Sequence, residues 1–441
     1  MSVETPNVLC ISVDSFRRDF SSVYNDSENT TPFLKEFGEQ SAVYNNAISP
    51  SCWTLQVHGS VFTGLYPPEH SVLDEGDVLG NHPTFAEILN EEGYNTQSFG
   101  HNGWLEAGGI LRGFDHTSTE PVFNSKPEAI LELLRQTRRG EPFASWILQR
   151  DNWTIENFSQ SIGQTQSPFC HFIHLNGAHW PYAPQSPHYK QFTSKTLLGV
   201  NLNIIRQRSI YDKRGEMYVG DYKPSTGDLK TIKDLYRGCL RNIDQYVESI
   251  IEILKAEDVY DNTIIVIFGD HGDNFGEDNI LGHQFSVADS LIRVPLIIHD
   301  PTDRIKNGVF SDIVQLNDLY ETIIGLTGAD SPDTNSIDIR TETRDTAYTY
   351  YSASTSFINK ISEDIDRDRL PPKKQFVAWQ SPDDKLIYYP DEEEYAGPGY
   401  DCDELQDSLM QHQRQLQRIK QQKSETLSDD IKENLEQMGY L

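Results

Sequence analysis

The chain has 441 residues, with 67 Asp and Glu against 37 Lys and Arg, so its formal net charge is −30 and its pI is about 4.7. Nucleic acids and anionic membrane surfaces bind clustered Lys and Arg, so this balance disfavours both as partners. Hydrophobic residues make up 37% of the chain, but 20 Phe, 21 Tyr and 6 Trp can build large cores, which excludes disorder along the whole length.

The sequence shows no segment that predicts membrane insertion or export. No apolar run approaches the roughly 18 residues of a membrane-spanning helix. The first residues carry no basic region before the first predicted strand, so we expect no signal peptide. Five scattered cysteines lack metal-ligand spacing and suit a reducing compartment. These features predict a soluble, cytoplasmic protein and leave its oligomeric state open.

The first part of the chain alternates between strand-like and helix-like segments. A short apolar run over residues 8–13 ends in Asp14 and is typical of a buried parallel strand. Residues 45–51 lack a pattern and are predicted to be irregular. Amphipathic spacing predicts helices over residues 32–40, 53–63 and 83–92, and the next strand over 95–99. This alternation predicts an α/β fold with a mostly parallel central sheet.

Two polar, poorly patterned stretches, residues 126–166 and 185–225, are expected to be insertions that cap the site. The elements predicted around them are a strand over residues 168–175, a long helix over 229–255, an apolar strand over 262–268, an edge strand over 293–299 and a helix over 312–328. Beyond about residue 331 the predicted elements are strands at 347–351, 375–379 and 385–389, an acidic loop at 391–394, and helices at 403–423 and 427–438. We therefore predict a catalytic domain over residues 1–335 and a smaller C-terminal α+β subdomain over 336–441.

Three separate segments place a potential metal ligand at the end of an apolar strand or the start of a helix. They supply Asp14, Thr54 and the adjacent pair Asp270 and His271. Burying a carboxylate and an imidazole without partners costs several kcal/mol, and a divalent cation would compensate both. This donor set suits Zn²⁺ or Mn²⁺ better than an all-oxygen Ca²⁺ site, with Mg²⁺ and Ca²⁺ as alternatives. A bound cation would also make the Thr54 hydroxyl a nucleophile.

A series of short motifs, in order over about residues 6–330, resembles the sulfatase family of the alkaline phosphatase superfamily. The motifs are NVLCISVDSFRRD at 7–19, SVFTG at 60–64, PTFAEIL at 83–89, GFD at 113–115, AHWPY at 178–182, GDHG at 269–272, LGH at 281–283 and RVPL at 293–296. The resemblance implies a three-layer α/β/α domain and a metal-dependent hydrolase of sulfate, phosphate or phosphonate esters. It implies one metal site and leaves a second possible.

The nucleophile position departs from the family's signature, in which a Cys that becomes formylglycine is followed by Pro or Ala and then Arg. Counting back from the Thr63-Gly64 pair reaches Thr54 instead of Cys52, and His58 stands where the family has Arg. A Thr nucleophile resembles phosphodiesterase and phosphonate-hydrolase members and haloarchaeal sulfatase-like proteins. The alternative role for Thr54 is a helix N-cap, and the alternative for Cys52 as a nucleophile is a small buried thiol.

The resemblance adds three catalytic candidates to Thr54, namely His58, His179 and His283, and His58 lies one helical turn after Thr54. His179 and His283 are also the candidates for a second metal. Ser15 stands where the family often has another metal-binding Asp. Three further histidines are expected to be structural: His171, His174 and His299.

The expected substrate is a small anionic ester of a sugar, a lipid headgroup or an aryl alcohol. Two alternatives stay open: transfer of a phosphoryl headgroup within the same superfamily, and a catalytically inactive ligand-binding relative.

The charge of −30 predicts a protein that needs salt, such as one from a halophilic microbe. The Debye length falls from about 10 Å at 0.1 M to about 3 Å at 1 M salt, so molar salt screens the repulsion among surface carboxylates. We expect the melting temperature to rise between 0.1 M and 2 M KCl, measured by circular dichroism. A melting temperature that is unchanged or lower at high salt would contradict this prediction.

Overall fold

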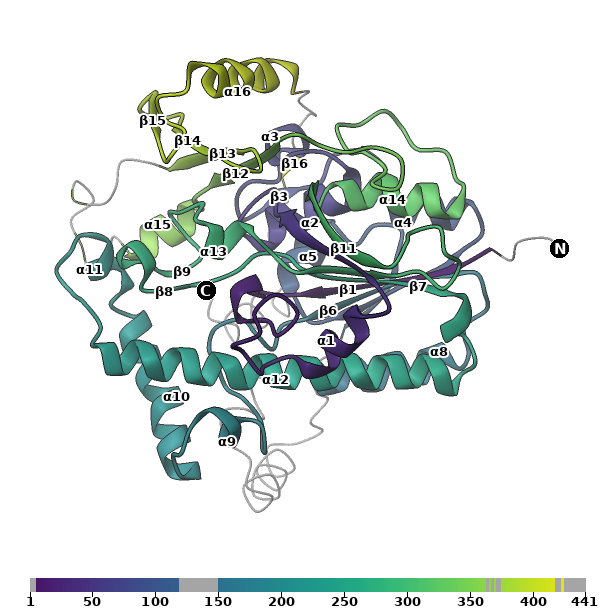
Figure 1. Ribbon diagram of the computed structural model, residues 1–441, viewed down its shortest axis with the longest axis horizontal. Helices are drawn as coiled ribbons and strands as arrows, with labels where there is room; N and C mark the ends of the chain where they lie inside the picture. Colours follow the sequence, from purple (N-terminus) through teal and green to yellow (C-terminus); the bar gives the residue numbers. More distant parts are fainter. Residues whose placement is uncertain are drawn as a thin grey trace.

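Eight strands form one central sheet (Figure 1). The computed structural model describes residues 5–118, 150–361, 365, 369, 374–416 and 422–423. The strand order is β11-β2-β10-β7-β1-β6-β4-β5, and every pair is parallel except the two made by β10. The strands are β1 Asn7–Val13, β2 Ala42–Ile48, β4 Asn95–Gly100, β5 Asp115–Ser118, β6 Phe169–Leu175, β7 Thr263–Gly269, β10 Leu296–His299 and β11 Gly308–Gln315. The predicted mostly parallel α/β fold is confirmed.

Helices cover both faces of this sheet because its central strands are apolar on both sides. In β1, Val8 and Cys10 pack into the core on one face, and Leu9, Ile11 and Val13 pack into the core on the other. The first face is covered by α2 (Thr54–Thr63), α4 (Phe85–Glu91), α5 (Gly103–Ala107) and α14 (Asp318–Thr327). The second face is covered by α1 (Pro32–Gly38), α8 (Asp151–Ile162) and α12 (Thr226–Ala256). The domain therefore has the predicted three layers.

Three predictions about individual elements are wrong. Residues 45–51 were expected to be irregular, yet β2 runs through Asn45 and Asn46 because the Asn46 side chain bonds the Ser311 carbonyl at 2.6 Å and Arg293 at 3.1 Å. β10 lies between β7 and β2, so it is not an edge strand. The start of the helix predicted over 312–328 belongs to β11, because pairing with β2 outweighs the local helical pattern.

The two predicted insertions have different places in the fold. In the first, α8 packs against α12 and β4, and Phe158 lies 5.5 Å from Phe99 between ring centroids, so this part covers the sheet. Residues 126–149 lie outside the described residues. The second insertion forms α9 (Tyr189–Phe192), α10 (Leu197–Tyr211) and α11 (Arg214–Tyr218), which lie beside α12 or lead into it (Figure 1).

The C-terminal region forms a small antiparallel sheet fastened to the main domain. Its strands are β12 (Ala347–Ser352), β13 (Gln375–Gln380), β14 (Lys385–Tyr389) and β15 (Glu394–Ala396), and α16 (Asp403–Gln415) follows them. The amide of Gln315, at the end of β11, bonds both backbone groups of Tyr348 at 2.7 and 3.0 Å. Leu409 of α16 packs in the core of this sheet. The predicted helix at 403–423 ends early, and 427–438 lies outside the described residues.

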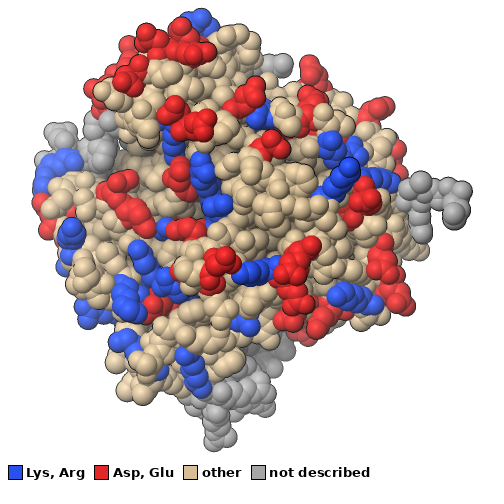
Figure 2. All heavy atoms as spheres, viewed as in Figure 1, with Lys and Arg blue, Asp and Glu red and all other residues tan. Residues whose placement is uncertain are grey.

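Acidic side chains are spread over the surface, and in the view of Figure 2 they gather over the C-terminal subdomain, where α16 begins with Asp403 and Glu404. Within the described ranges, no helix combines the length and the apolar character that a membrane crossing needs.

His171 on β6 gives the fold a measurable pH dependence. Burial among the rings of Phe99, Phe158 and Phe169 lowers the pKa of this imidazole to about 3, against 6.5 in an unfolded chain. Between these values the unfolded state binds more protons, so stability falls as the pH is lowered. We expect the free energy of unfolding of the wild type to fall by about 1 kcal/mol more than that of His171→Leu between pH 6 and 5, in urea titrations.

The control for this measurement is Phe169→Leu, which loosens the same cluster without removing a titrating group. It should keep the wild-type pH slope. A His171→Leu variant with the wild-type slope would show that the neutral His171 is not part of the acid sensitivity.

Candidate active site

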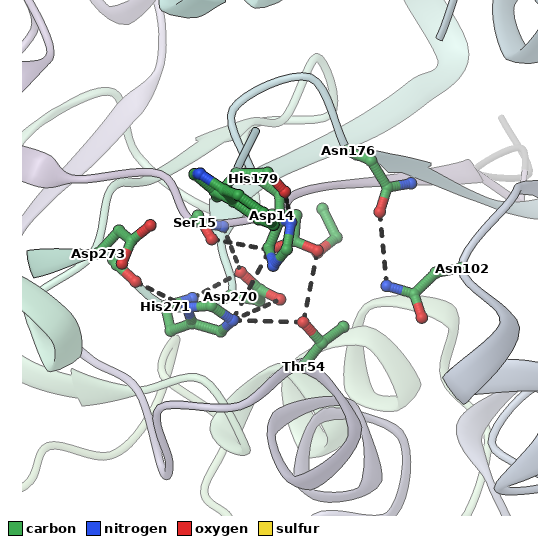
Figure 3. Close-up of polar contacts among 12 residues, drawn as sticks. Asp14, Ser15, Thr54, Asn102, Asn176, His179, Asp270, His271 and Asp273 are labelled. Carbon is green, nitrogen blue, oxygen red and sulfur yellow. Dashed lines mark hydrogen bonds and ion pairs between the residues drawn. The ribbon is translucent and has the colours of Figure 1, made fainter. Parts of the chain in front are cut away.

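The site lies at the carboxyl ends of three neighbouring parallel strands. Val13 of β1 pairs with Leu175 of β6 and with Gly269 of β7, so the three strands end at the same level. The next residues, Asp14, Asn176 and Asp270, therefore meet at one edge of the sheet (Figure 3). Open α/β sheets bind their ligands at this edge.

Thr54 enters the site from above the sheet, at the first turn of α2. Its Oγ1 lies 3.4 Å from Asp14 Oδ2 and 3.2 Å from His271 Nε2, and the residue is fully buried (Figure 3). Trp53 is the N-cap and Thr54 is the first residue of the helix, so the alternative role of Thr54 as an N-cap is wrong. The helix start also favours an anion, because its first N–H groups have no acceptor within the helix.

Cys52 lies two residues earlier but faces away from the site. Its thiol donates to the Ser286 carbonyl at 3.1 Å, the side chain is fully buried, and burial raises its pKa. A thiol with a raised pKa is a poor nucleophile. Thr54, and not Cys52, therefore lies beside the candidate ligands, in agreement with the count back from the Thr63-Gly64 pair.

Backbone and hydroxyl donors fix the two carboxylates. The backbone N–H groups of Ser15 and His271 donate to Asp270 Oδ1 at 3.1 and 2.7 Å, and the Ser15 hydroxyl donates to Asp14 Oδ1 at 2.9 Å. Ser15 adopts a left-handed conformation, with φ of 57°, which is uncommon for a residue with a side chain. Ser15 therefore orients both carboxylates where the family often has a further acid.

His271 is held in the tautomer that suits a ligand. Its Nδ1 lies 2.7 Å from the carbonyl of Gly272, so Nδ1 carries the proton and donates it there. The lone pair is then on Nε2, which points toward Asp14 Oδ1 and Asp270 Oδ2, each at 3.7 Å. This hydrogen bond is the outer contact that metal-binding histidines typically make.

These donors fit a divalent cation. Asp14, Asp270 and His271 offer ligand atoms within 4.8 Å of one another, and all three are buried. Asp270 Oδ2 has no hydrogen-bond partner among the described residues, which a buried carboxylate oxygen rarely tolerates. Tetrahedral donors about 2.1 Å from an ion are about 3.4 Å apart, close to the observed separations of 3.2 to 3.7 Å.

The two carboxylates have opposite pKa shifts. Burial would raise the pKa of Asp14, but the neighbouring His179, His174 and His271 outweigh it and hold that pKa well below its usual range. Burial, and then the charge of Asp14, raise the pKa of Asp270 well above its usual range. Two buried carboxylates this close do not ionise together without compensating positive charge.

The structure places the candidate histidines in two different positions. His58 lies behind the site, where its Nδ1 donates to the Thr54 carbonyl at 2.8 Å and its Nε2 accepts from the Ser12 hydroxyl at 2.9 Å. Both ring nitrogens are occupied, and burial lowers its pKa to about 3, so His58 is a neutral positioning residue and has no free nitrogen for an ester. His179 and His283 line a pocket beside the site, with ring centroids 5.7 Å apart.

Two polar residues of the site were not predicted as functional. His174, predicted to be structural, lies with Nε2 3.6 Å from Asp14 Oδ2. Asn176, which was not considered, accepts from Asn102 Nδ2 at 3.4 Å (Figure 3). Parallel pairing of β1 with β6 brings both to the site, and the position of His174 one residue before the strand end was the available signal.

The fold and site define an α/β protein of the alkaline phosphatase-like type. The model of the Sulfatase family matches residues 6–329, so the chain belongs to the Sulfatase family. Arylsulfatase K of Canis lupus familiaris is 25% identical over 367 residues, which cover 74% of this chain and 64% of the relative. An arylsulfatase of Clostridium perfringens is 23% identical over 375 residues, covering 74% of this chain and 76% of the relative. The chain thus spans just under two thirds of arylsulfatase K.

Solved structures confirm the fold. The phosphonate monoester hydrolase from Silicibacter pomeroyi superimposes with a TM-score of 0.70 at 17% identity, over 96% of this chain and all of that chain (100%). The structure of the phosphonate monoester hydrolase of Agrobacterium radiobacter gives a TM-score of 0.68 at 16% identity, over 93% and 94% of the two chains.

Removal of one ligand tests the cation site. We expect the wild-type protein to retain about one equivalent of Zn²⁺ or Mn²⁺ after dialysis and to melt at a lower temperature after chelation. In Asp270→Asn the bound metal should be lost, and the chelated variant should be more stable than the chelated wild type, because a neutral amide avoids the cost of protonating a buried carboxyl beside Asp14. Elemental analysis and thermal melts measure both effects.

Asp273→Asn is the matched control, since Asp273 is a buried carboxylate outside the donor cluster that accepts from Tyr182 and Tyr211. It should keep the metal. Full metal retention by Asp270→Asn would show that this cluster is not the site.

Proposed function

We propose that this protein is a metal-dependent hydrolase of sulfate or phosphonate esters in which Thr54 is the nucleophile. The observation that carries the proposal is the position of Thr54 Oγ1, 3.4 Å from Asp14 and 3.2 Å from His271 in a fully buried site. The relatives named as sulfatases and phosphonate monoester hydrolases support ester hydrolysis as the reaction.

Four side chains would hold the cation: Asp14, Thr54, Asp270 and His271. A nitrogen ligand beside two carboxylates favours Zn²⁺ or Mn²⁺ over Ca²⁺. When bound, such a cation supplies positive charge that lowers the pKa of a ligated hydroxyl and stabilises the oxygens of the transferred group.

The chain's own residues supply orientation and proton transfer. His58 holds the carbonyl of Thr54 and thereby fixes the first turn of α2, so the hydroxyl stays aimed at the sheet edge. Thr54, its hydroxyl proton released to solvent, attacks sulfur or phosphorus in line with the departing alcohol. A bond forms to Thr54 Oγ1 while the bond to the alcohol oxygen breaks, and water then hydrolyses the Thr ester. His179 and His283 line the pocket on the side where the leaving group would depart. His179 Nδ1 lies 2.5 Å from the Trp180 carbonyl and donates its proton there, so His283, whose Nε2 has no partner among the described residues, is the imidazole that can donate an N–H to the departing oxygen.

The nucleophile affects which esters suit the site. A formylglycine hydrate can expel sulfate by elimination, whereas a Thr ester must be displaced by water. We therefore place phosphonate and phosphate esters level with or slightly above sulfate esters as substrates.

Replacing each nucleophile candidate tests the proposal. We expect Thr54→Ala to lower kcat on an aryl phosphonate or aryl sulfate by about a thousandfold or more, because the variant loses the hydroxyl that contacts both Asp14 and His271. Thr54→Ser should retain part of the activity. Cys52→Ala should change kcat by less than about fivefold and lower stability by roughly 1 to 2 kcal/mol through the lost buried thiol.

Assays of aryl sulfate, aryl phosphonate and aryl phosphate in parallel give the substrate preference, and mass spectrometry of quenched reactions locates the covalent ester on the peptide that contains Thr54. Activity that survives Thr54→Ala but not Cys52→Ala would overturn the assignment.

A further inference from the structure

A pocket adjoins the site and is lined by residues of the catalytic domain and of the C-terminal region. His179 and His283 form its inner end, and the ring of His283 lies 4.5 Å from that of His271. The part of a substrate that lies beyond the reacting group would therefore enter this pocket. Five aromatic side chains line it: Trp53, Trp180, Tyr211, Tyr351 and Phe357.

Two of these rings form a fixed flat wall. Trp180 and Tyr211 are stacked with centroids 4.5 Å apart and an interplanar angle of 25°. The hydroxyl of Tyr211 lies 3.3 Å from Asp273 Oδ2, which also accepts from Tyr182. These hydrogen bonds hold the Tyr211 ring in place. Flat aromatic walls bind the faces of rings, either aryl groups or sugars.

Arg214, at the start of α11, is the only Lys or Arg among the residues that line this pocket. Its Nη1 donates to the Tyr211 carbonyl at 3.0 Å, and its guanidinium carbon lies 5.1 Å from the centre of the Phe357 ring. Among the described residues it forms no ion pair within 4 Å with a carboxylate, although the chain carries 67 acidic residues. A half-buried guanidinium held by a carbonyl and a ring retains donors for an anion.

The position of Arg214 separates it from the reacting group. Arg214 lines the pocket together with His283, whereas His271, whose ring lies 4.5 Å from that of His283, does not line it. The candidate cation site already offers positive charge for the reacting group. Arg214 thus offers a second point of attraction for an anion.

We propose that this pocket binds the leaving group of the ester, and that Arg214 binds an anionic substituent on its ring. The preferred substrates are then esters of an aryl or pyranose alcohol that carry a second negative charge, such as a carboxylate. This inference rests on the proposed ester hydrolysis, but it makes a separate claim about binding. It also explains how an acidic protein attracts such a dianion, since the attraction is local.

Binding of product-like ligands to the full-length protein tests this claim without catalysis. The probes are 4-hydroxybenzoate and glucuronate, each against its methyl ester, followed by calorimetry and by the fluorescence of Trp53 and Trp180. We expect at least one acid to bind about tenfold more tightly than its ester, and Arg214→Gln to reduce this preference to about twofold or less. The aromatic and pyranose pairs show which kind of ring the wall accepts.

Lys213→Gln is the matched control, because it removes the same charge from the neighbouring exposed residue, which does not line the pocket. It should leave the preference unchanged, and Arg214→Lys should keep part of it. A wild-type protein that binds each acid no better than its ester, or an Arg214→Gln variant that keeps the preference, would overturn the proposal.

Kinetics separate the proposal from the function on which it rests. The substrates are phosphonate or sulfate esters of 4-hydroxybenzoate and of its methyl ester, and each variant is compared with the wild type on the same substrate. Arg214→Gln should lower kcat/KM about tenfold for the carboxylate ester and by less than about twofold for the methyl ester. Equal losses on both would place Arg214 at the reacting group and contradict the proposal. If neither ester is hydrolysed while the binding preference holds, the proposed function fails and the anion subsite stands.

Discussion

The close approach of two buried carboxylates is the constraint on which the site depends. β1 and β7 are neighbours in register, so Asp14 and Asp270 follow their strands at the same level. Water reaches neither side chain, and the repulsion between them must be offset by positive charge or by a proton. Imidazole rings, the N–H groups of Ser15 and His271, and the start of α2 surround the two carboxylates and offset part of this repulsion. One oxygen of Asp270 is still unpaired, and a cation would complete this arrangement.

The same constraint explains the contrast between surface and interior. The chain carries a net charge of −30, yet five histidines surround Asp14 or line the adjoining pocket: His58, His174, His179, His271 and His283. Histidine supplies hydrogen bonds and ligand nitrogens without a permanent buried charge, whose desolvation would cost several kcal/mol. Arg214 is the only Lys or Arg among the residues that line the pocket.

The sequence predicts those parts of the site that depend on strand ends and helix starts. Asp14 and the pair Asp270 and His271 each follow an apolar run, and counting within one helix finds Thr54. The contribution of His174 could not be predicted in this way, because its contact with Asp14 arises from the pairing of β1 with β6, which are more than 150 residues apart. The same limit applies to β2, where Asn45 and Asn46 lack strand propensity and long-range partners decide the conformation.

Family membership fixes the scaffold more firmly than the reaction. The chain belongs to the Sulfatase family, but the residue that meets the candidate ligands is Thr54, and the nearby Cys52 donates to a carbonyl on the far side of the helix start. A hydroxyl and a formylglycine hydrate at this position demand different second steps, because only the hydrate can release the group by elimination. The strands, the carboxylates and His271 would hold a cation beside any group transferred from an ester. Which group is then released efficiently depends on the chemistry of one side chain at the start of α2, and the fold itself leaves that choice open.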